Sequence, residues 1–238
     1  MLKEGAFVIS DAHYSHIRPE LLDFLKSINT KQLQPTQLIL MGDIFDTLFG
    51  NVPYTQEVNS LAVEILNEIS KEIEVVYLEG NHDFNLKKVF PDAKVFGIKQ
   101  QPVKITYGDI DILLAHGDIE SPLLYNIYTS IVRNPFVISV LNILDSISDH
   151  FIINRLDEYL SKKDDCKEFT GFRGFIEKRL GNKYECNYFV EGHFHQNKTL
   201  KFEDYTYINL AAFACNQRYF IVKSSQDVEF LEENIFSK

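Results

Sequence analysis

The sequence has no tryptophan and little cysteine, and neither glycine nor proline is abundant. Its 238 residues include 3 Cys, 11 Gly and 7 Pro. These counts exclude collagen-like chains, disulfide-rich scaffolds and Gly/Pro-rich disordered chains. Cys166, Cys186 and Cys215 form no close pair and have no zinc-type spacing. We therefore expect a reducing compartment rather than a disulfide framework, with structural roles for all three cysteines.

Positive charge and long hydrophobic runs are also scarce. The sequence contains 24 Lys and Arg and 34 Asp and Glu, which gives a formal net charge of −10 at pH 7. An acidic body is repelled by phosphate backbones, which disfavours nucleic acid as a partner. The N-terminal segment MLKEGAFVISDAH has one lysine and a short apolar run, so it predicts neither a signal peptide nor a membrane span. We expect a protein that is made in the cytosol and stays there, and we infer no obligate protein partner.

Apolar runs and amphipathic stretches alternate in the first third of the chain. Runs of branched apolar residues predict strands, whereas apolar residues three or four positions apart predict helices. The expected order is strand 6–10, helix 19–28, strand 38–41, helix 57–70 and strand 74–78. This β-α-β-α-β order predicts an α/β domain built on a central sheet.

The rest of the chain predicts short strands on either side of a helical stretch. We expect strands at 103–107, 110–115, 205–210, 218–223 and 228–231. The intervening stretch, roughly 122–183, has helical patterning, and the chain shows no Gly/Ser linker or internal repeat. The expectation is one domain, residues 1–238, with a helical insertion at about 119–185 over one end of the sheet.

Five short polar motifs each follow an apolar, strand-like run. They are Asp11-Ala-His13, Gly42-Asp43-Ile-Phe-Asp46, Gly80-Asn81-His82-Asp83, His116-Gly117-Asp118 and Gly192-His193-Phe-His195. Any one of them alone could be an ordinary turn or helix cap. However, they contain most of the histidines in the chain, and ligands of open α/β sheets gather beyond the carboxyl ends of the strands. The motifs are therefore expected to converge on one site.

The residue types in these motifs are those that bind metal ions. Asp, Asn and His without thiolates favour Mn²⁺, iron or Zn²⁺ at a reactive site over a structural zinc. There are more candidate ligands than one metal ion can bind, which indicates two ions that share a bridging carboxylate. Such a pair can activate a water molecule and neutralise charge on a phosphoryl group.

In this order, the five motifs resemble those of the calcineurin-like metallophosphoesterases. The resemblance implies a β-sandwich core flanked by helices, with the insertion as a lid. It implies two divalent ions, one held by Asp11, His13, Asp43 and His195 and the other by Asp43, Asn81, His116 and His193.

The resemblance also implies a catalytic role for two further residues. A hydroxide that bridges the two ions would attack phosphorus. His82, steadied by Asp83, would stabilise the transition state or protonate the leaving oxygen. Asp46 would either orient a metal ligand or cap the adjacent turn.

The insertion opens with an apolar segment, PLLYNIYTSIVRNPFVISVLNILDSI, at 122–147. Asn134-Pro135 divides it into two helical stripes, each too short to span a bilayer. Helices that are apolar nearly all round are either buried against the sheet or face an apolar ligand. Because the segment directly follows a metal motif, we favour a lid for a substrate with acyl chains. The predicted substrate contacts are Asp118, Tyr125, Tyr128, Phe136 and Leu141.

Over almost its whole length the chain is similar to the UDP-2,3-diacylglucosamine pyrophosphatases of lipid A biosynthesis. The match includes the metal motifs, the insertion pattern at Tyr125, Tyr128, Val132, Asn134 and Pro135, and the closing Asp227-Val-Glu. It implies Mn²⁺-dependent hydrolysis of UDP-2,3-diacylglucosamine at the α-phosphorus, which yields UMP and 2,3-diacylglucosamine 1-phosphate. It also implies peripheral contact with the cytoplasmic face of the bacterial inner membrane.

Three positions depart from the pattern of that narrower family. His82 stands where Arg is usual, Gln196-Asn197 where Arg-Pro is usual, and Ala12 where Leu is usual. His82 is typical of the wider superfamily. The alternative function is therefore a general dinuclear metallophosphoesterase that acts on another phosphomonoester or phosphodiester. A non-enzymatic scaffold is disfavoured because the ligand set and His82 are all present.

Overall fold

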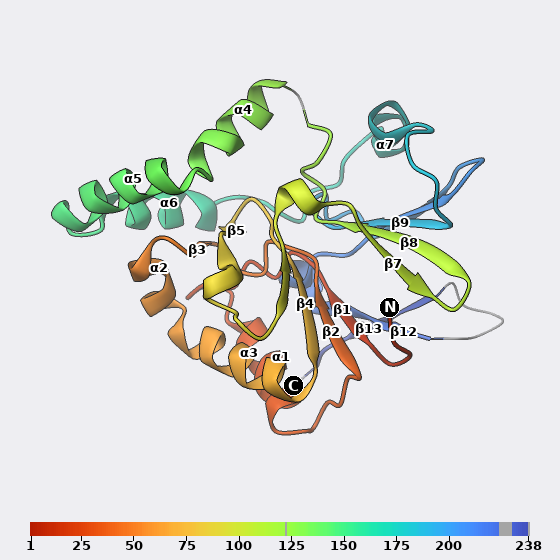
Figure 1. Cartoon of the computed structure of the whole chain (residues 1–238), viewed down its shortest axis with the longest axis horizontal. Coiled ribbons are helices and arrows are strands. Elements are labelled where there is room, and N and C mark those ends of the chain that lie inside the picture. Colours follow the sequence, from red (N-terminus) through yellow and green to blue (C-terminus); the bar gives the residue numbers. More distant parts are fainter. Residues whose placement is uncertain (122, 224–229, 238) are drawn as a thin grey trace.

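Two β-sheets packed face to face form the centre of the molecule in the computed structural model, which describes residues 1–121, 123–223 and 230–237 (Figure 1). The first sheet has the order β13-β12-β1-β2-β4-β6 and the second has the order β10-β11-β9-β8-β7. Apolar side chains from both sheets, such as Val8, Ile39, Leu114 and Val190, meet in one buried cluster between them. The fold is therefore a β-sandwich, as expected.

The strands that lead into the metal motifs lie side by side and run parallel. In the first sheet these are β1 (Phe7–Ile9), β2 (Gln37–Leu40) and β4 (Glu74–Leu78). In the second sheet they are β8 (Ile110–Ala115) and β9 (Tyr188–Glu191). The other strands are β3 (Leu48–Phe49), β5 (Asp83–Phe84), β6 (Lys94–Phe96), β7 (Val103–Tyr107), β10 (Lys198–Lys201), β11 (Thr206–Asn209), β12 (Arg218–Val222) and β13 (Leu231–Ile235).

Helices cover the outer faces of both sheets. Leu21, Phe24 and Leu25 of α1 (Glu20–Asn29) and Leu66 of α3 (Ser60–Glu72) are buried on the first sheet, since their spacing places them on one helical face. Phe172 and Ile176 of α7 (Phe172–Leu180) are buried on the second sheet. A short helix, α8 (Phe213–Asn216), precedes β12.

Two of the predicted elements differ clearly from those in the structure, and strands such as β6 and β10 were not predicted. The predicted helix 57–70 is two helices, α2 (Pro53–Val58) and α3, separated at Asn59. The Asn59 amide donates to the carbonyls of Thr47 and Thr55, at 2.9 and 2.8 Å, which holds the break in place. The last strand is β13 (Leu231–Ile235), whereas the sequence predicts a strand at 228–231. Residues 228 and 229 of that predicted strand lie outside the described residues, as does the Asp227-Val-Glu pattern.

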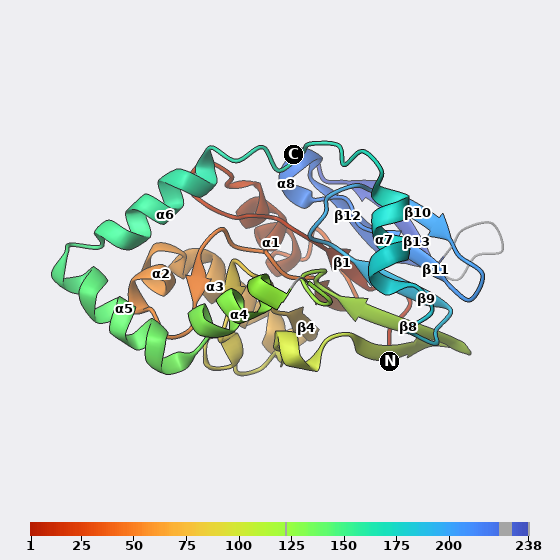
Figure 2. The same ribbon diagram turned by 90° about the horizontal axis from the view of Figure 1, so that it is seen from above.

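Four helices connect the adjacent strands β8 and β9. They are α4 (Leu123–Val132), α5 (Pro135–Ile147), α6 (Phe151–Ser161) and α7. The Asn134 side chain accepts from the Phe136 and Val137 amides and so caps α5, which explains why the chain breaks at Asn134-Pro135. Figure 2 shows α4, α5 and α6 extending away from the sandwich; we call residues 123–161 the arm.

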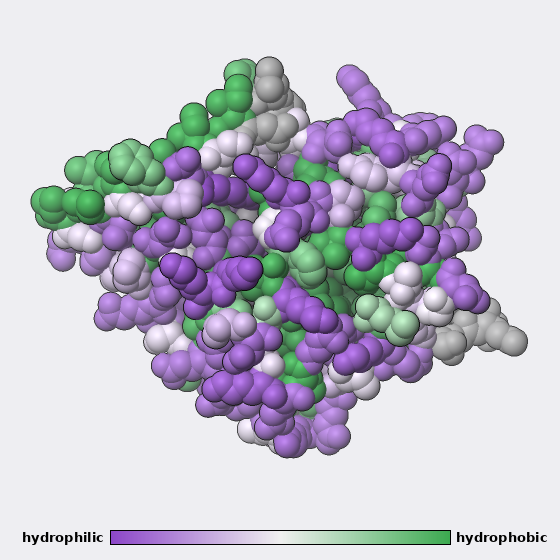
Figure 3. Space-filling view, viewed as in Figure 1, coloured by the Kyte–Doolittle hydropathy of each residue, from purple (hydrophilic) through white to green (hydrophobic). Residues whose placement is uncertain are grey.

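The arm carries much of the exposed apolar surface. Ile138 anchors it by packing on Phe49, Val52 and Phe84. Other apolar side chains of the arm are exposed, and Figure 3 shows them gathered along α4 and α5; they include Leu124, Ile131, Phe136, Ile143, Leu144 and Ile147. Within the described residues, no single helix is both long and apolar enough to cross a membrane, although α5 and α6, bent by 102°, pass that test as a pair.

Candidate metal centre

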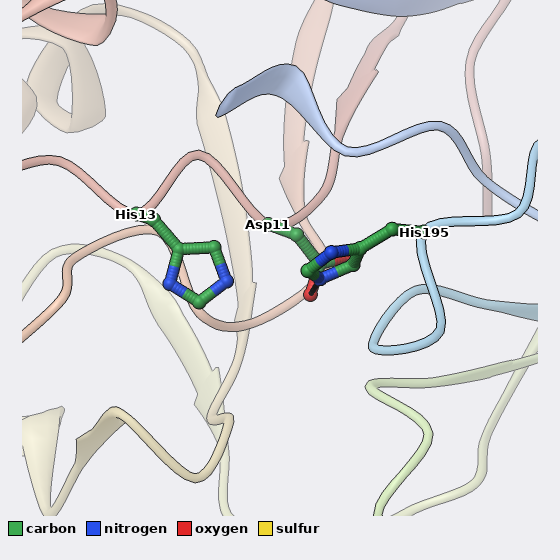
Figure 4. A group of neighbouring side chains, drawn as sticks. All are labelled: Asp11, His13 and His195. Carbon is green, nitrogen blue, oxygen red and sulfur yellow. Dashed lines mark ion pairs between the residues drawn. The ribbon is translucent and has the colours of Figure 1, made fainter. Parts of the chain in front are cut away.

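The first group of predicted ligands is Asp11, His13 and His195, from the loops after β1 and β9. Figure 4 shows the His195 ring against the Asp11 carboxylate with the His13 ring beside them, and His195 Nε2 lies 3.1 Å from Asp11 Oδ1. The Nδ1 atom of His13 lies 3.0 Å from Asp46 Oδ1. Its Nε2 is buried and has no hydrogen-bond partner among the described residues. In His13, one ring nitrogen contacts a carboxylate and the other is buried without a hydrogen-bond partner. This arrangement is typical of a histidine that binds a metal ion.

The second group is Asp43, His116 and His193. His116 Nε2 lies 3.3 Å from Asp43 Oδ2 and 3.3 Å from Asn81 Oδ1, so all four predicted ligands of this position are together. The Nδ1 atom of His116 donates to the Met41 carbonyl at 3.0 Å. This contact fixes the tautomer and leaves Nε2 free to bind a metal ion.

The two groups form one continuous centre. His82 joins His13 and Asp43 in a third overlapping group, and His13 and His82 are in edge contact with ring centroids 5.0 Å apart. His13 belongs to both the first and the third group, and Asp43 belongs to both the second and the third, so the ligands form one connected cluster. The sequence prediction that the five motifs converge beyond the strand ends is confirmed.

At two of the motif glycines, the backbone lies so close to a ligand carboxylate that no other residue fits. A Cβ on Gly80 would lie 2.2 Å from Asp43 Oδ1, and a Cβ on Gly192 would lie 2.4 Å from Asp11 Oδ2. No side chain fits in either place. The motifs therefore need glycine so that the backbone can pack against the ligand carboxylates.

The backbone at the ligands is itself strained. Five ligand residues have positive φ values between 45° and 61°, namely Asp11, His13, Asp43, His193 and His195. Such a conformation costs on the order of 1–3 kcal/mol at a non-glycine residue and is concentrated at functional sites. The surrounding sandwich maintains this geometry, which aims the side chains at one point.

Electrostatics prepare two of these ligands, Asp11 and His193, to bind cations. Burial would raise the pKa of Asp11, but His195 and His116 outweigh it and lower the pKa to about 2. Burial, and then the neighbouring His116, lower the pKa of His193 to about 4. An ionised carboxylate and a neutral imidazole are the states that bind divalent metal ions. The charge states of Asp11 and His193, together with the donor types of the other ligands, therefore fit the metal ions that the motifs imply.

Asp46 and Asp83 have clear structural roles. Asp46 orients the His13 ring, one of the two roles predicted for it. The prediction that Asp83 steadies His82 is wrong, because His82 Nδ1 donates instead to the Asp46 carbonyl at 3.0 Å. The Asp83 carboxylate accepts from the amides of Asp43 and Gly80 at 3.0 and 2.8 Å, and from the Ile44 and Phe45 amides and the Tyr77 hydroxyl. Asp83 therefore shapes the loops that carry the ligands.

The predicted substrate contacts are not gathered in one place. Asp118 is buried and paired with Arg133 at 2.8 Å. Tyr125 lines a cavity next to His193, whereas Phe136 and Leu141 are exposed on the arm. The side chain of Tyr128 lies outside the described residues.

Two arginines of the insertion, missed by sequence reasoning, hold the metal loops. Arg133 also donates to the Gly80 carbonyl at 2.9 Å. Arg179 of α7 donates to the carbonyls of Gly117 and Ile119, each at 3.0 Å, and to the Glu191 carboxylate. An ionisable Glu191 in the otherwise apolar strand YFVE was the one sequence signal that a buried cation lies nearby.

The expectation that no disulfide is present is wrong. Cys166 and Cys215 are bonded, and Cys186 is free. The bonded pair is 49 residues apart in sequence, so spacing could not reveal that the segment after α6 returns to α8. Next to the disulfide, the Asp165 carbonyl contacts His195 Nδ1. The bond therefore supports the segment that orients a predicted ligand.

Comparison with known proteins agrees with this site. The sequence model of the family described as Calcineurin-like phosphoesterase matches residues 6–197. A relative named UDP-2,3-diacylglucosamine hydrolase, from Histophilus somni (strain 129Pt), is 25% identical over 205 residues, which cover 80% of this chain and 83% of the relative. A relative of the same name from Aliivibrio fischeri (strain MJ11) is 24% identical over 165 residues, 67% of each chain. Among solved structures, the phosphoesterase Yfce from E. coli matches with a TM-score of 0.48 at 13% identity, over 98% of this chain and 99% of that chain.

The chain belongs to the calcineurin-like phosphoesterase family, because the family match covers most of its length and includes all five motifs. It is accordingly a hydrolase of the metallophosphoesterase class, as the sequence predicted.

Proposed function

We propose that the protein hydrolyses the diphosphate of UDP-2,3-diacylglucosamine and releases UMP and 2,3-diacylglucosamine 1-phosphate for lipid A biosynthesis. The observation that carries this proposal is the attachment of an apolar arm directly to the metal centre. Arg133, between α4 and α5 of the arm, contacts both Asp118 and the Gly80 carbonyl, each of which belongs to a metal motif. Exposed apolar side chains beside a phosphoryl site suit a substrate that joins acyl chains to a diphosphate. The similarity to hydrolases of that name points the same way.

Two divalent ions, Mn²⁺ in this proposal, would be held by the two ligand groups. When bound, they supply an activated water and neutralise charge on the phosphoryl oxygens. In the balanced reaction, a water oxygen bonds to the α-phosphorus, and the bond from that phosphorus to the bridging oxygen breaks. The bridging oxygen leaves with the acylated sugar phosphate, and UMP keeps the water oxygen.

His82 is the residue of the chain that is best placed to act on the leaving group. Its Nδ1 hydrogen is committed to the Asp46 carbonyl, so Nε2 faces the centre, 3.9 Å from Asp43 Oδ2. Burial is the main cause that lowers the pKa of His82. A ring held in this way can contact the developing charge or pass a proton to the leaving oxygen.

The proposal includes a location at the cytoplasmic face of the bacterial inner membrane, where an acylated substrate resides. The support for it is the apolar surface of the arm, on which Phe136 is 78% and Ile147 is 79% exposed. Burying such side chains in an acyl layer would contribute about 1.5–3 kcal/mol each.

A comparison of two substrates separates this function from a general phosphoesterase. We expect Leu124→Ser and Phe136→Ser to lower kcat/KM on the acylated UDP-sugar about tenfold, with a much smaller effect on a soluble aryl phosphodiester. The matched control is Val58→Ser, which changes an exposed apolar residue of α2, outside the arm. Equal losses on the two substrates would reject the role of the arm and favour the soluble-ester alternative.

A further inference from the structure

A cavity of about 630 Å³ lies against the metal centre, on the side away from α5 and α6. It is bounded by His193 and Gly117 of the ligand loops, Tyr125 of α4, and Phe175 and Lys178 of α7. Figure 1 shows α5 and α6 extending to one side of the molecule and α7 lying on the other. The cavity is therefore separate from the exposed apolar surface of α5.

The cavity combines an aromatic wall with a cation. Phe175 packs on Phe169 and Phe194 with ring centroids 5.0 and 5.4 Å apart, yet it remains 37% exposed. The Phe194 ring is in turn 4.9 Å from that of His193. These tilted and edge-on contacts lead from a predicted metal ligand to the partly exposed Phe175 ring, which has the Arg179 guanidinium 5.9 Å from its centroid.

Lys178 is the cation of this cavity that is available to a ligand. Lys183 is paired with Glu120 at 2.6 Å, and Arg179 is held by Glu191. Lys178, by contrast, makes no ion pair with any of the residues that the structure describes. A partly exposed ring beside an unpaired ammonium group suits a planar base linked to a phosphate.

The two sides of the centre differ in a way that orients a two-part substrate. The arm packs through Ile138 on Phe84, two residues after His82, so the leaving-group side of the centre adjoins apolar surface. The cavity adjoins His193 at the other side. A substrate with its acyl chains on the arm would place its nucleoside at the cavity.

We propose that this cavity binds the nucleoside 5′-phosphate portion of the substrate, with Phe175 stacking on the base and Lys178 contacting phosphate. The proposal rests on the proposed function for the direction of the substrate. It makes Phe175 and Lys178 determinants of nucleotide specificity, distinct from the groups that hold the metal ions.

Direct binding measurements test this proposal without relying on turnover. The full chain, loaded with Mn²⁺, is titrated with UMP and with ribose 5-phosphate, and the dissociation constants are obtained by calorimetry. We expect UMP to bind about tenfold more tightly, since its base stacks on an aromatic ring and ribose 5-phosphate has no base. Phe175→Leu should bring the ratio of the two constants close to one, while Lys178→Ala should weaken both ligands.

Matched controls come from α6 and the residue that follows it. Phe151→Leu changes an exposed phenylalanine of α6 and Lys162→Ala changes an exposed lysine directly after α6, and both variants should keep wild-type constants. Thermal unfolding verifies that each variant is folded. An unchanged ratio in Phe175→Leu, or wild-type protein that binds ribose 5-phosphate as well as UMP, would overturn the proposal. If the Phe175-dependent preference appears but the acylated UDP-sugar is not hydrolysed, the cavity is supported and the lipid substrate is rejected.

Discussion

Arg133, just after α4, donates to the carboxylate of Asp118, which directly follows the ligand loop His116-Gly117, at a distance of 2.8 Å. The Asp118 side chain is fully buried and the Arg133 side chain is 12% exposed. This contact joins the arm to the metal centre, so the position of the arm and the geometry of the centre are mechanically linked.

Arg133→Met should destabilise the protein by about 3 kcal/mol, because it leaves the buried Asp118 carboxylate without its cation. The double variant Arg133→Met/Asp118→Asn should recover part of this loss, since no unpaired charge then remains. Urea unfolding of the wild type, both single variants and the double variant measures the coupling. Strictly additive losses would show that the two side chains do not interact.

Asp43→Ala and His116→Ala should each abolish turnover without unfolding the chain. Both residues are ligands in the shared part of the centre, and neither is part of the apolar core. Bound metal, measured by elemental analysis after dialysis, should fall in both variants, while Asp92→Ala, at an exposed site, should behave as wild type. Activity retained in either ligand variant would contradict the ligand assignment.

His82 and Asp83 are neighbours whose substitutions should have different effects. His82→Ala should lower kcat by about 10²–10⁴-fold with the metal content unchanged, because it removes a group that acts on the reacting atoms. Asp83→Asn should mainly lower stability, since the carboxylate accepts from several loop amides and from Tyr77. Kinetics and thermal unfolding of both variants distinguish these roles. Loss of metal from His82→Ala, or a kcat near the wild-type value, would contradict this role of His82.

The Cys166–Cys215 bond should stabilise the protein by about 2–4 kcal/mol, as expected for a disulfide that closes a loop of this length. Cys166→Ser should lose this contribution and should also weaken metal binding, because Asp165, whose carbonyl contacts His195, is the preceding residue. Cys186→Ser is the control, since that thiol is free. Equal stability of the two serine variants would argue against a structural role for the bond.

The metal ligands could be predicted because each motif is local in sequence and follows a strand. Once β1, β2 and β4 are parallel neighbours, as are β8 and β9, the positions of Asp11, Asp43 and His116 follow from the sheet topology. The strand and helix ranges that surround them were predictable for the same reason, since local periodicity sets them.

The supporting contacts could not be predicted because they join residues that are distant in sequence. Arg133 reaches back 53 positions to Gly80, and Cys166 forms its bond 49 positions away. Similarly, the His82 ring donates a hydrogen bond to the carbonyl of Asp46, 36 positions earlier, and not to the adjacent Asp83. Such contacts depend on how the loops fold over the sandwich, which no local pattern specifies.

The most direct test of the central claim is hydrolysis of UDP-2,3-diacylglucosamine by the Mn²⁺-loaded protein in ¹⁸O-water. We expect UMP release that far exceeds turnover of a soluble aryl phosphodiester, with the ¹⁸O label found in UMP because water attacks the α-phosphorus. Turnover of the aryl phosphodiester without release of UMP would contradict the proposed substrate. Label found in the acylated sugar phosphate would contradict the proposed point of attack.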